Sequence, residues 1–287
     1  MKKLIVIILT FTIILTGCST NNNVTETTQP ENRQDLQNDI GDSSNTNSNI
    51  PDNINTAGSL FEKGYYDYQG TINNDITIRM SLYPLEKDIV GSYFYESQKK
   101  EIDLKGKAGG EDILLYEYDE TGKNTGVFRG SMDTVDKIEG TWTSADNKKN
   151  YPFTLSLISN LPGAEYGKRY AIAALKASDQ DVENFINKVQ DYVMNNKKEE
   201  LSKQISYPIT VKIDGKATTI QNKDDFIKHY DKIFYLDYKQ VIGSASTKYM
   251  FANWQGIMFG TGSSNIWINE LTATDGNQKL MITAINH

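Results

Sequence analysis

The sequence predicts an α+β protein in which an antiparallel β-meander of about eight strands precedes a second, α+β domain. Three observations lead to this fold class. Between residues 65 and 158, apolar and polar side chains alternate in short runs that Gly, Asn and Asp interrupt, which is typical of β-strands. After Ser178 the apolar residues recur at helical spacing, and near the end of the chain the alternation of strands returns.

The first region contains the eight predicted strands. Their connections are short, and a parallel crossover needs a dozen residues or more, so we expect consecutive antiparallel hairpins. Glycine recurs inside several runs and weakens a flat strand, so we expect a curled sheet or a barrel. The predicted strands are 65–70, 76–83, 89–95, 101–106, 113–118, 126–131, 137–143 and 151–158.

This region resembles the small avidin-like and lipocalin-like barrels, in architecture alone. A barrel of eight strands is wide enough for side chains or for one small ligand. Its aromatic residues either line the mouth of such a barrel or are ordinary strand residues, and the sequence leaves both interpretations open. They are Tyr93, Phe94, Tyr95, Tyr116, Tyr118, Phe128 and Trp142.

The second region begins with a capping box at Ser178, in which Asp181 takes the place of the usual glutamate. The helix that follows is amphipathic, and a shorter helix is expected over 197–205. Tyr207-Pro208 ends helical geometry, and Asp214-Gly215 predicts a two-residue hairpin. Asn222 caps a third helix, after which strands are expected at 246–253, 255–260, 266–271 and 279–285.

This order of elements resembles the NTF2-like, or cystatin-like, fold, in which a curved sheet wraps its helices into a cone. Residues 205–208, 225–234 and 253–260 carry the resemblance, together with Ile266-Trp267. It implies a domain such as those that end many bacterial envelope proteins. The fold hosts isomerases, dehydratases, transport factors and dimerisation modules, so the resemblance implies no activity.

The chain starts with Lys2 and Lys3, which precede an apolar leader that ends in Leu15-Thr16-Gly17-Cys18, and Cys18 is the single cysteine. This start resembles that of a bacterial lipoprotein. The resemblance implies a signal peptide over 1–17, cleavage before Cys18 and a palmitate-like acyl lipid on that residue. We therefore expect extracytoplasmic localisation with a lipid anchor in the membrane, on the outer face of the cell membrane in a Gram-positive organism.

A polar tether is expected to follow the lipidated cysteine. Residues 18–58 are rich in Asn and carry six acids against Arg33, and they contain too few large apolar side chains to offset the entropy of ordering. We expect a β-meander domain at 59–160, a linker at 161–175 and the NTF2-like domain at 176–287. The net charge of −7 without a basic stripe excludes nucleic acid as a partner.

No residue pattern predicts catalysis, a metal or a cofactor. His229 is expected at the side of a helix, and His287 ends the sequence, where fraying is usual. Side chains that could line a pocket in the cone, with Asp191 as the base of an isomerase-like reaction, are equally explained by packing. These pocket candidates are Tyr192, Tyr207, Tyr230, Trp254, Met258 and Trp267.

The leading hypothesis is a non-enzymatic binding or scaffold protein of the cell envelope. Its expected partners are the membrane, cell-wall glycan or an envelope protein, and a second copy of the chain through the C-terminal domain. Two alternatives stay open from the sequence. One is an NTF2-like enzyme acting on a small apolar substrate, and the other is an inhibitor or immunity-type partner of a cell-wall hydrolase.

Overall fold

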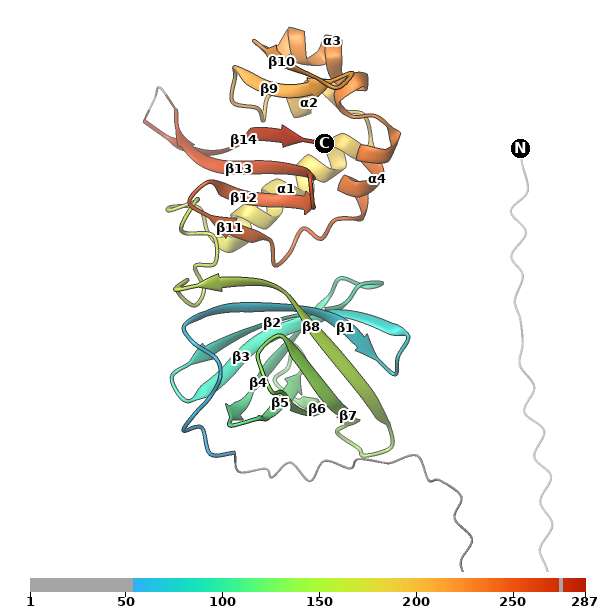
Figure 1. The fold of residues 1–287 in the computed structure, drawn as a ribbon, viewed down its shortest axis with the longest axis vertical. Coiled ribbons are helices and arrows are strands. Elements are labelled where there is room, and N and C mark those ends of the chain that lie inside the picture. The colour runs from blue at the N-terminus through green and yellow to red at the C-terminus, as the bar shows by residue number, and fades with distance from the viewer. Residues whose placement is uncertain (1–53, 274–275) are drawn as a thin grey trace, which may run out of the picture. The chain divides into compact units, whose positions relative to one another are not determined.

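A computed structural model describes residues 54–273 and 276–287. The fold is mostly β, with a closed eight-stranded antiparallel barrel and few helices (Figure 1). The predicted signal peptide, Cys18 and the predicted tether up to Asn53 lie outside the described residues.

The barrel is an up-and-down meander in which every strand pairs with its neighbours in sequence. The first strand also pairs antiparallel with the eighth, which closes the sheet. The eight predicted strands are therefore confirmed, and of the two predicted forms the barrel is the one found. The strands are β1 (Gly64–Ile72), β2 (Ile76–Leu85), β3 (Asp88–Tyr95), β4 (Glu101–Gly109), β5 (Asp112–Tyr118), β6 (Asn124–Ser131), β7 (Lys137–Ser144) and β8 (Asn150–Pro162).

The glycines inside the strands allow the backbones of the barrel to approach closely. A Cβ atom at Gly91 would lie 2.0 Å from the carbonyl oxygen of Ser81, and one at Gly106 would lie 1.8 Å from that of Leu114. No real side chain tolerates such contacts with backbone atoms. The sequence-based expectation that these glycines accompany curvature therefore has a steric reason.

Aromatic side chains fill the barrel interior. Tyr93 packs edge-on against Phe128 at 5.4 Å between ring centroids, and Phe128 packs in the same way against Phe153. Glu117 is buried there too, accepting hydrogen bonds from Tyr93 Oη at 2.7 Å and Trp142 Nε1 at 2.9 Å. Thus Tyr93, Phe128 and Trp142 are core residues rather than the lining of an open mouth.

The folded region begins earlier than the sequence suggests. Ile54, expected in the tether, is buried against Leu114 and Val127 of the barrel. The N–H of Gly110 donates to the carbonyl of Gly58 at 3.3 Å. Residues 54–58 therefore pack on the barrel, because one isoleucine among polar residues is enough to cover an apolar patch on the strands.

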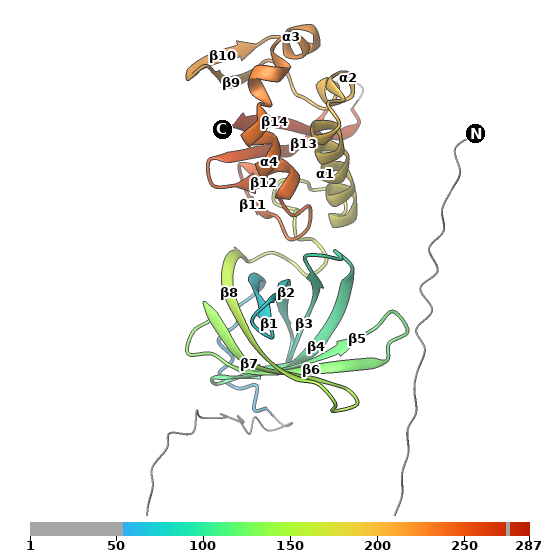
Figure 2. The same cartoon turned by 90° about the vertical axis from the view of Figure 1, so that its right-hand side faces the viewer.

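The C-terminal region packs helices on one face of a four-stranded antiparallel sheet. Both views place the first and fourth helices along this face (Figures 1 and 2). Val182, Ile186 and Val189 of the first helix and Ile257 and Ile268 of the sheet are among its buried core. The elements are α1 (Asp179–Met194), α2 (Lys198–Ser202), β9 (Ile209–Ile213), β10 (Lys216–Ile220), α3 (Lys223–Ile233), α4 (Leu236–Ser244), β11 (Phe251–Asn253), β12 (Gly256–Thr261), β13 (Ser264–Thr272) and β14 (Gln278–Asn286).

The predicted capping box at Ser178 and Asp181 is present, and Asn222 caps α3 as expected. The second helix is shorter than predicted. On either side of its expected end at Ile205, Gln204 and Ser206 instead exchange backbone hydrogen bonds with Ile282 of β14. Pairing with the sheet replaces the last helical turn.

Two further differences lie between residues 236 and 253. The helix α4 was not predicted, although Tyr238 and Ile242 are buried four positions apart. The strand expected over 246–253 is reduced to β11, because Ser246 forms a local turn with Lys248 and Tyr249 has φ of 54°. Extended backbone is incompatible with that angle.

The predicted hairpin is present as β9 and β10, with Asp214 and Gly215 both at positive φ. It forms a two-stranded sheet of its own. A parallel bridge joins Ile205, which precedes the hairpin in the chain, to Ile282 of the four-stranded sheet. Hydrogen bonding between strands is thus not continuous across the C-terminal region.

Candidate functional site

A row of polar side chains crosses the outer surface of the barrel. Asp67 of β1 lies opposite Ser81 of β2, which lies opposite Ser92 of β3, which in turn lies opposite Asp103 of β4. Directly opposed residues point to the same face of a sheet. Because Tyr68 and Tyr93, one position away, point into the barrel core, this row points outward.

Arg169 closes one end of the row. Its guanidinium forms an ion pair with Asp67, and Nη1 donates to Ser81 Oγ at 3.1 Å. The exposed fractions of the Arg169 and Asp67 side chains are 4% and 1%. Burial alone would lower the pKa of Arg169, but the Asp67 carboxylate raises it, so the guanidinium stays charged. This buried pair joins the barrel to the segment that precedes α1.

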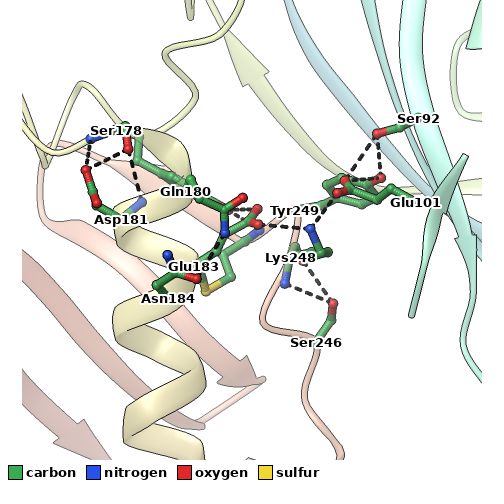
Figure 3. A network of polar contacts seen from close by, with 12 residues as sticks. Ser92, Glu101, Ser178, Gln180, Asp181, Glu183, Asn184, Ser246, Lys248 and Tyr249 are labelled. Carbon is green, nitrogen blue, oxygen red and sulfur yellow. Dashed lines mark hydrogen bonds and ion pairs between the residues drawn. The ribbon is translucent and has the colours of Figure 1, made fainter. Parts of the chain in front are cut away.

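A second set of contacts, here called the junction network, consists of Ser92, Glu101, Glu183, Lys248 and Tyr249 (Figure 3). Tyr249 Oη lies 2.7 Å from Ser92 Oγ and donates to Glu101 Oε1 at 3.0 Å. Lys248 Nζ lies 2.5 Å from Glu101 Oε2 and 3.2 Å from Glu183 Oε2. One loop thereby connects two strands of the barrel with helix α1.

Burial shifts the pKa values of two side chains in the junction network, Glu183 and Tyr249. Burial raises the pKa of Glu183, and the neighbouring Lys248 ammonium offsets part of that rise. Burial, followed by the Glu101 charge, raises the pKa of Tyr249 well above its ordinary value of 10.0. The Tyr249 hydroxyl therefore stays protonated at neutral pH and cannot act as a base toward Ser92.

A cavity of about 460 Å³ opens beside these groups and is here called the acidic cavity. The lining residues include four carboxylates, of which Glu101 and Glu183 pair with Lys248, and one guanidinium, that of Arg169, which pairs with Asp67. Tyrosine rings form part of its wall. The carboxylates are Glu101, Asp103, Asp179 and Glu183, and the tyrosines are Tyr65, Tyr166 and Tyr249.

The acidic cavity is suited to a small ligand that carries positive charge or hydroxyl groups. Carboxylates accept hydrogen bonds from ammonium and hydroxyl groups, and tyrosine faces attract cations. Asp179 already accepts the backbone N–H groups of Arg169 and Tyr170, whereas Asp103 is exposed at the edge of the cavity. Within the described ranges, no group of three or more His, Cys, Asp or Glu side chains could hold a metal ion.

A larger cavity of about 700 Å³ lies between α1 and β14. Its basic lining residues, Lys176, Lys188, Lys203 and Lys279, are all exposed. The acidic cavity has buried ionisable groups in its wall, and such groups mark functional sites more often than exposed lysines do. We therefore take the acidic cavity as the candidate functional site.

The pocket candidates from the sequence lie in separate places. Tyr230 is in the core, where its hydroxyl donates to the carbonyl of Val193 at 3.2 Å. Tyr207 donates to the carbonyl of Ser202, and Tyr192 is half-buried beside Lys197. These three tyrosines share no cavity with the other three candidates, which come from the sheet region.

Those three remaining candidates do not point toward the helices. Met258 and Trp267 are paired across β12 and β13 and are partly exposed, while their neighbours Ile257 and Ile268 are buried. Trp254, in the turn after β11, is 79% exposed. The alternation of the strands assigns the isoleucines to the core and the larger side chains to the opposite face.

Both histidines lie away from the acidic cavity. His229 contacts Asp225 on α3, with Nδ1 3.2 Å from Oδ1. His287, expected to fray, instead packs against Tyr235 and Tyr238, with ring centroids 5.2 and 4.9 Å away. Asp191, the base of the hypothetical isomerase, pairs with Lys197 at 2.7 Å.

The sequence contained one signal for the site. Glu183 lies next to Val182 on the stripe of α1 that also carries Ile186, and a charged residue at such a position is a candidate for a buried partner. Arg169, Lys248 and Tyr249 carry no comparable pattern. They were missed because their partners are distant in the chain.

Comparison with known proteins adds no assignment. No protein-family model matches the chain, and a search of curated proteins finds no significant match. Over the part of the chain that is described, no helix combines the length and apolarity needed to cross a membrane.

Proposed function

We propose that this protein is a lipid-anchored, extracytoplasmic binding protein that takes a small cationic ligand in the acidic cavity. The observation that carries the binding function is the composition of that cavity, with four carboxylates and three tyrosines around about 460 Å³. Ligand sites typically have volumes of about 300–1,000 Å³, and this cavity falls within that range.

The anchor is supported by the sequence. Cys18 follows Leu15-Thr16-Gly17 at the end of an apolar leader, and two acyl chains hold a protein stably on a membrane. In this proposal residues 1–17 are a signal peptide and the chain functions outside the cytoplasm. An NTF2-like character of residues 176–287 belongs to the same proposal, supported by the order of helices, hairpin and antiparallel strands.

A binding role is favoured over catalysis by the state of the groups in the cavity. The Ser92 hydroxyl is engaged by Tyr249 and Glu101, and Tyr249 is held protonated by burial and the Glu101 charge. A nucleophile needs a base that can accept its proton. Cell-wall material rich in amino sugars is the class of partner that fits such a cavity.

Calorimetric titration tests the binding function. Glucosamine, which carries an ammonium group, is expected to bind the full chain, and N-acetylglucosamine, which is uncharged, is expected to bind more weakly. Asp103→Asn should weaken glucosamine binding by roughly threefold to tenfold, because one charge-assisted hydrogen bond is lost. Asp75→Asn, in the exposed β1–β2 turn, is the matched control. Equal affinity of Asp103→Asn and wild type would reject the site.

Metabolic labelling with palmitate tests the anchor separately. The wild-type chain should incorporate label and fractionate with membranes, and Cys18→Ala should do neither. Label on Cys18→Ala at the wild-type level would contradict the lipoprotein assignment and would leave the cavity proposal untouched.

A further inference from the structure

The larger cavity, of about 700 Å³ between α1 and β14, is here called the lysine groove. Its four lysines come from different parts of the chain. Lys176 precedes α1 and Lys188 lies within it, whereas Lys203 follows α2 and Lys279 lies in β14. The fold thus gathers four positive charges in one hollow of a chain whose net charge is −7. A concave surface lined mainly by one sign of charge strengthens the field inside it, so the lysine groove attracts anions.

The ammonium groups of these four lysines are not neutralised by neighbouring side chains. Elsewhere on the surface, exposed lysines pair with carboxylates, as Lys168 does with Glu165 at 2.9 Å. Among residues 54–273 and 276–287, no ion pair or hydrogen bond engages the four ammonium groups of the groove. Their charges are therefore available to a ligand.

Two carboxylates also line the groove, and both already hold neutral donors. Asp181 accepts from the backbone N–H and the hydroxyl of Ser178. Glu270 accepts the backbone N–H groups of Lys176 and Ala177 at 2.8 and 2.9 Å. Four ammonium groups against two carboxylates leave an excess of positive charge. This excess matches a phosphate monoester, which carries nearly two negative charges at neutral pH.

Part of the groove wall is apolar. Phe185 lies on the same stripe of α1 as Asp181 and Lys188, about one helical turn from each. Phe185 and Leu280 of β14 are half-buried, because each packs against the core and also lines the groove. A hydrated inorganic anion leaves this apolar surface in water, whereas a ligand with an apolar group covers it and gains free energy.

We propose that the lysine groove is a second binding site, which takes a phosphate monoester of an apolar group. The phosphate lies among the lysine ammonium groups, which act as point charges toward its oxygens, and the apolar group packs on Phe185 and Leu280. The lysine groove shares no lining residue with the acidic cavity and attracts the opposite charge, so this site does not depend on the binding function proposed above. The ester is either a soluble molecule or the head group of a phospholipid.

Calorimetric titration of the full chain with three probes tests the proposal. Phenyl phosphate combines a phosphate with an apolar ring, whereas inorganic phosphate and phenol each lack one of these groups. Phenyl phosphate should bind about tenfold more tightly than either of the other two probes. Equal affinity for phenyl phosphate and inorganic phosphate, or no binding of phenyl phosphate, would overturn the proposal.

Variants locate the binding in the groove. Lys188→Gln combined with Lys279→Gln should weaken the binding of phenyl phosphate about tenfold, because two ammonium groups are lost. The matched control combines Lys107→Gln with Lys223→Gln, at two exposed lysines that do not line the groove, and it changes the net charge by the same amount. Equal weakening by the two double variants would show a general effect of surface charge and would reject the site. Lys188→Arg with Lys279→Arg keeps the charge and should bind nearly as the wild type does.

Vesicle flotation separates the two sources of the ester. The Cys18→Ala chain, which lacks the predicted site of lipidation, is mixed with phosphatidylcholine vesicles that contain phosphatidic acid or lack it. Flotation that requires phosphatidic acid and is lost on adding Lys188→Gln and Lys279→Gln identifies a lipid head group as the ligand. Binding of phenyl phosphate without such flotation identifies a soluble ester.

Discussion

The hydroxyl oxygens of Tyr249 and Ser92 lie 2.7 Å apart although 157 positions separate the two residues. Tyr249 reaches this contact from a backbone with φ of 54°, a region that costs a non-glycine residue about 1–2 kcal/mol. Its ring packs on Phe94 with centroids 5.3 Å apart. The packing and the hydrogen bonds to the barrel offset the backbone strain, so the loop before β11 is determined by its partners rather than by its own sequence.

Removing the Tyr249 hydroxyl tests how much the junction network contributes to the free energy of unfolding. We expect Tyr249→Phe to reduce the free energy of unfolding by about 1–2 kcal/mol, because Glu101 loses a donor and Ser92 a partner. Tyr166→Phe, at a tyrosine that is 51% exposed, should change it little. Urea denaturation followed by circular dichroism measures both, and equal effects would contradict the role given to the network.

Replacing only one partner of the buried Arg169–Asp67 ion pair should strongly reduce the free energy of unfolding. Arg169→Met should cost about 3–5 kcal/mol, since it leaves a carboxylate buried without its counter-charge. The matched control is Arg79→Met, whose ion pair with Glu96 has exposed fractions of 22% and 38% and should contribute no more than about 1 kcal/mol.

A double variant separates the charge from the shape of Arg169. Adding Asp67→Asn to Arg169→Met should recover part of the lost stability, because no uncompensated charge remains in the buried site. If the double variant is less stable than Arg169→Met, packing rather than charge makes this pair important.

The close approach of β4 and β5 predicts that Gly106 cannot be replaced. Gly106→Ala should cost more than about 3 kcal/mol or prevent folding, because its Cβ would meet the Leu114 carbonyl oxygen at 1.8 Å. Gly122→Ala is the comparison, since Gly122 has φ of 77° but open space around it, and should cost about 1 kcal/mol. Thermal unfolding distinguishes the two, and similar losses would show that closure of the barrel does not depend on this contact.

The packing of His287 predicts a pH dependence of stability. Burial, with the Lys212 charge as a smaller cause, lowers the pKa of His287 below its ordinary value of 6.5. The unfolded chain therefore binds the proton more tightly. The contribution of His287 to stability is complete above pH 6.5 and is lost as the pH falls from 6.5 through the folded-state pKa.

His287→Phe keeps an aromatic ring between Tyr235 and Tyr238 and removes the titrating group. Its stability should fall less steeply than that of the wild type as the pH is lowered below 6.5. His229→Phe, at the histidine beside Asp225, is the control for losing a histidine as such. Parallel curves for His287→Phe and wild type would contradict the prediction.

Local sequence patterns predicted most of the secondary structure. The eight strands of the barrel follow from alternation, and Ser178 and Asn222 mark the starts of α1 and α3 by their capping side chains. The helix α4 was not predicted, because it follows α3 almost without interruption and its apolar face is short. The strand predicted over 246–253 is interrupted at Tyr249, which has a left-handed backbone and whose hydroxyl contacts Ser92, far away in the sequence.

The candidate sites were much less predictable. Tyr230 and Trp267 were chosen as aromatic residues of a cone, yet the structure places Tyr230 in the core and Trp267 on the other face of the sheet. Arg169 lies in a segment without periodicity, and nothing near it in sequence shows that Asp67 is its partner.

Local patterns along the chain predicted most of the strands and helices and the antiparallel pairing of the barrel strands, because each of these depends on residues within a few positions of one another. The closure of the barrel, its filling by aromatic side chains, and the contacts of Asp67, Ser92 and Glu101 with Arg169, Lys248 and Tyr249 are seen only in the folded chain. Such contacts join residues about a hundred or more positions apart, and alternation or helical spacing reports which face a side chain occupies but not which distant side chain it will meet.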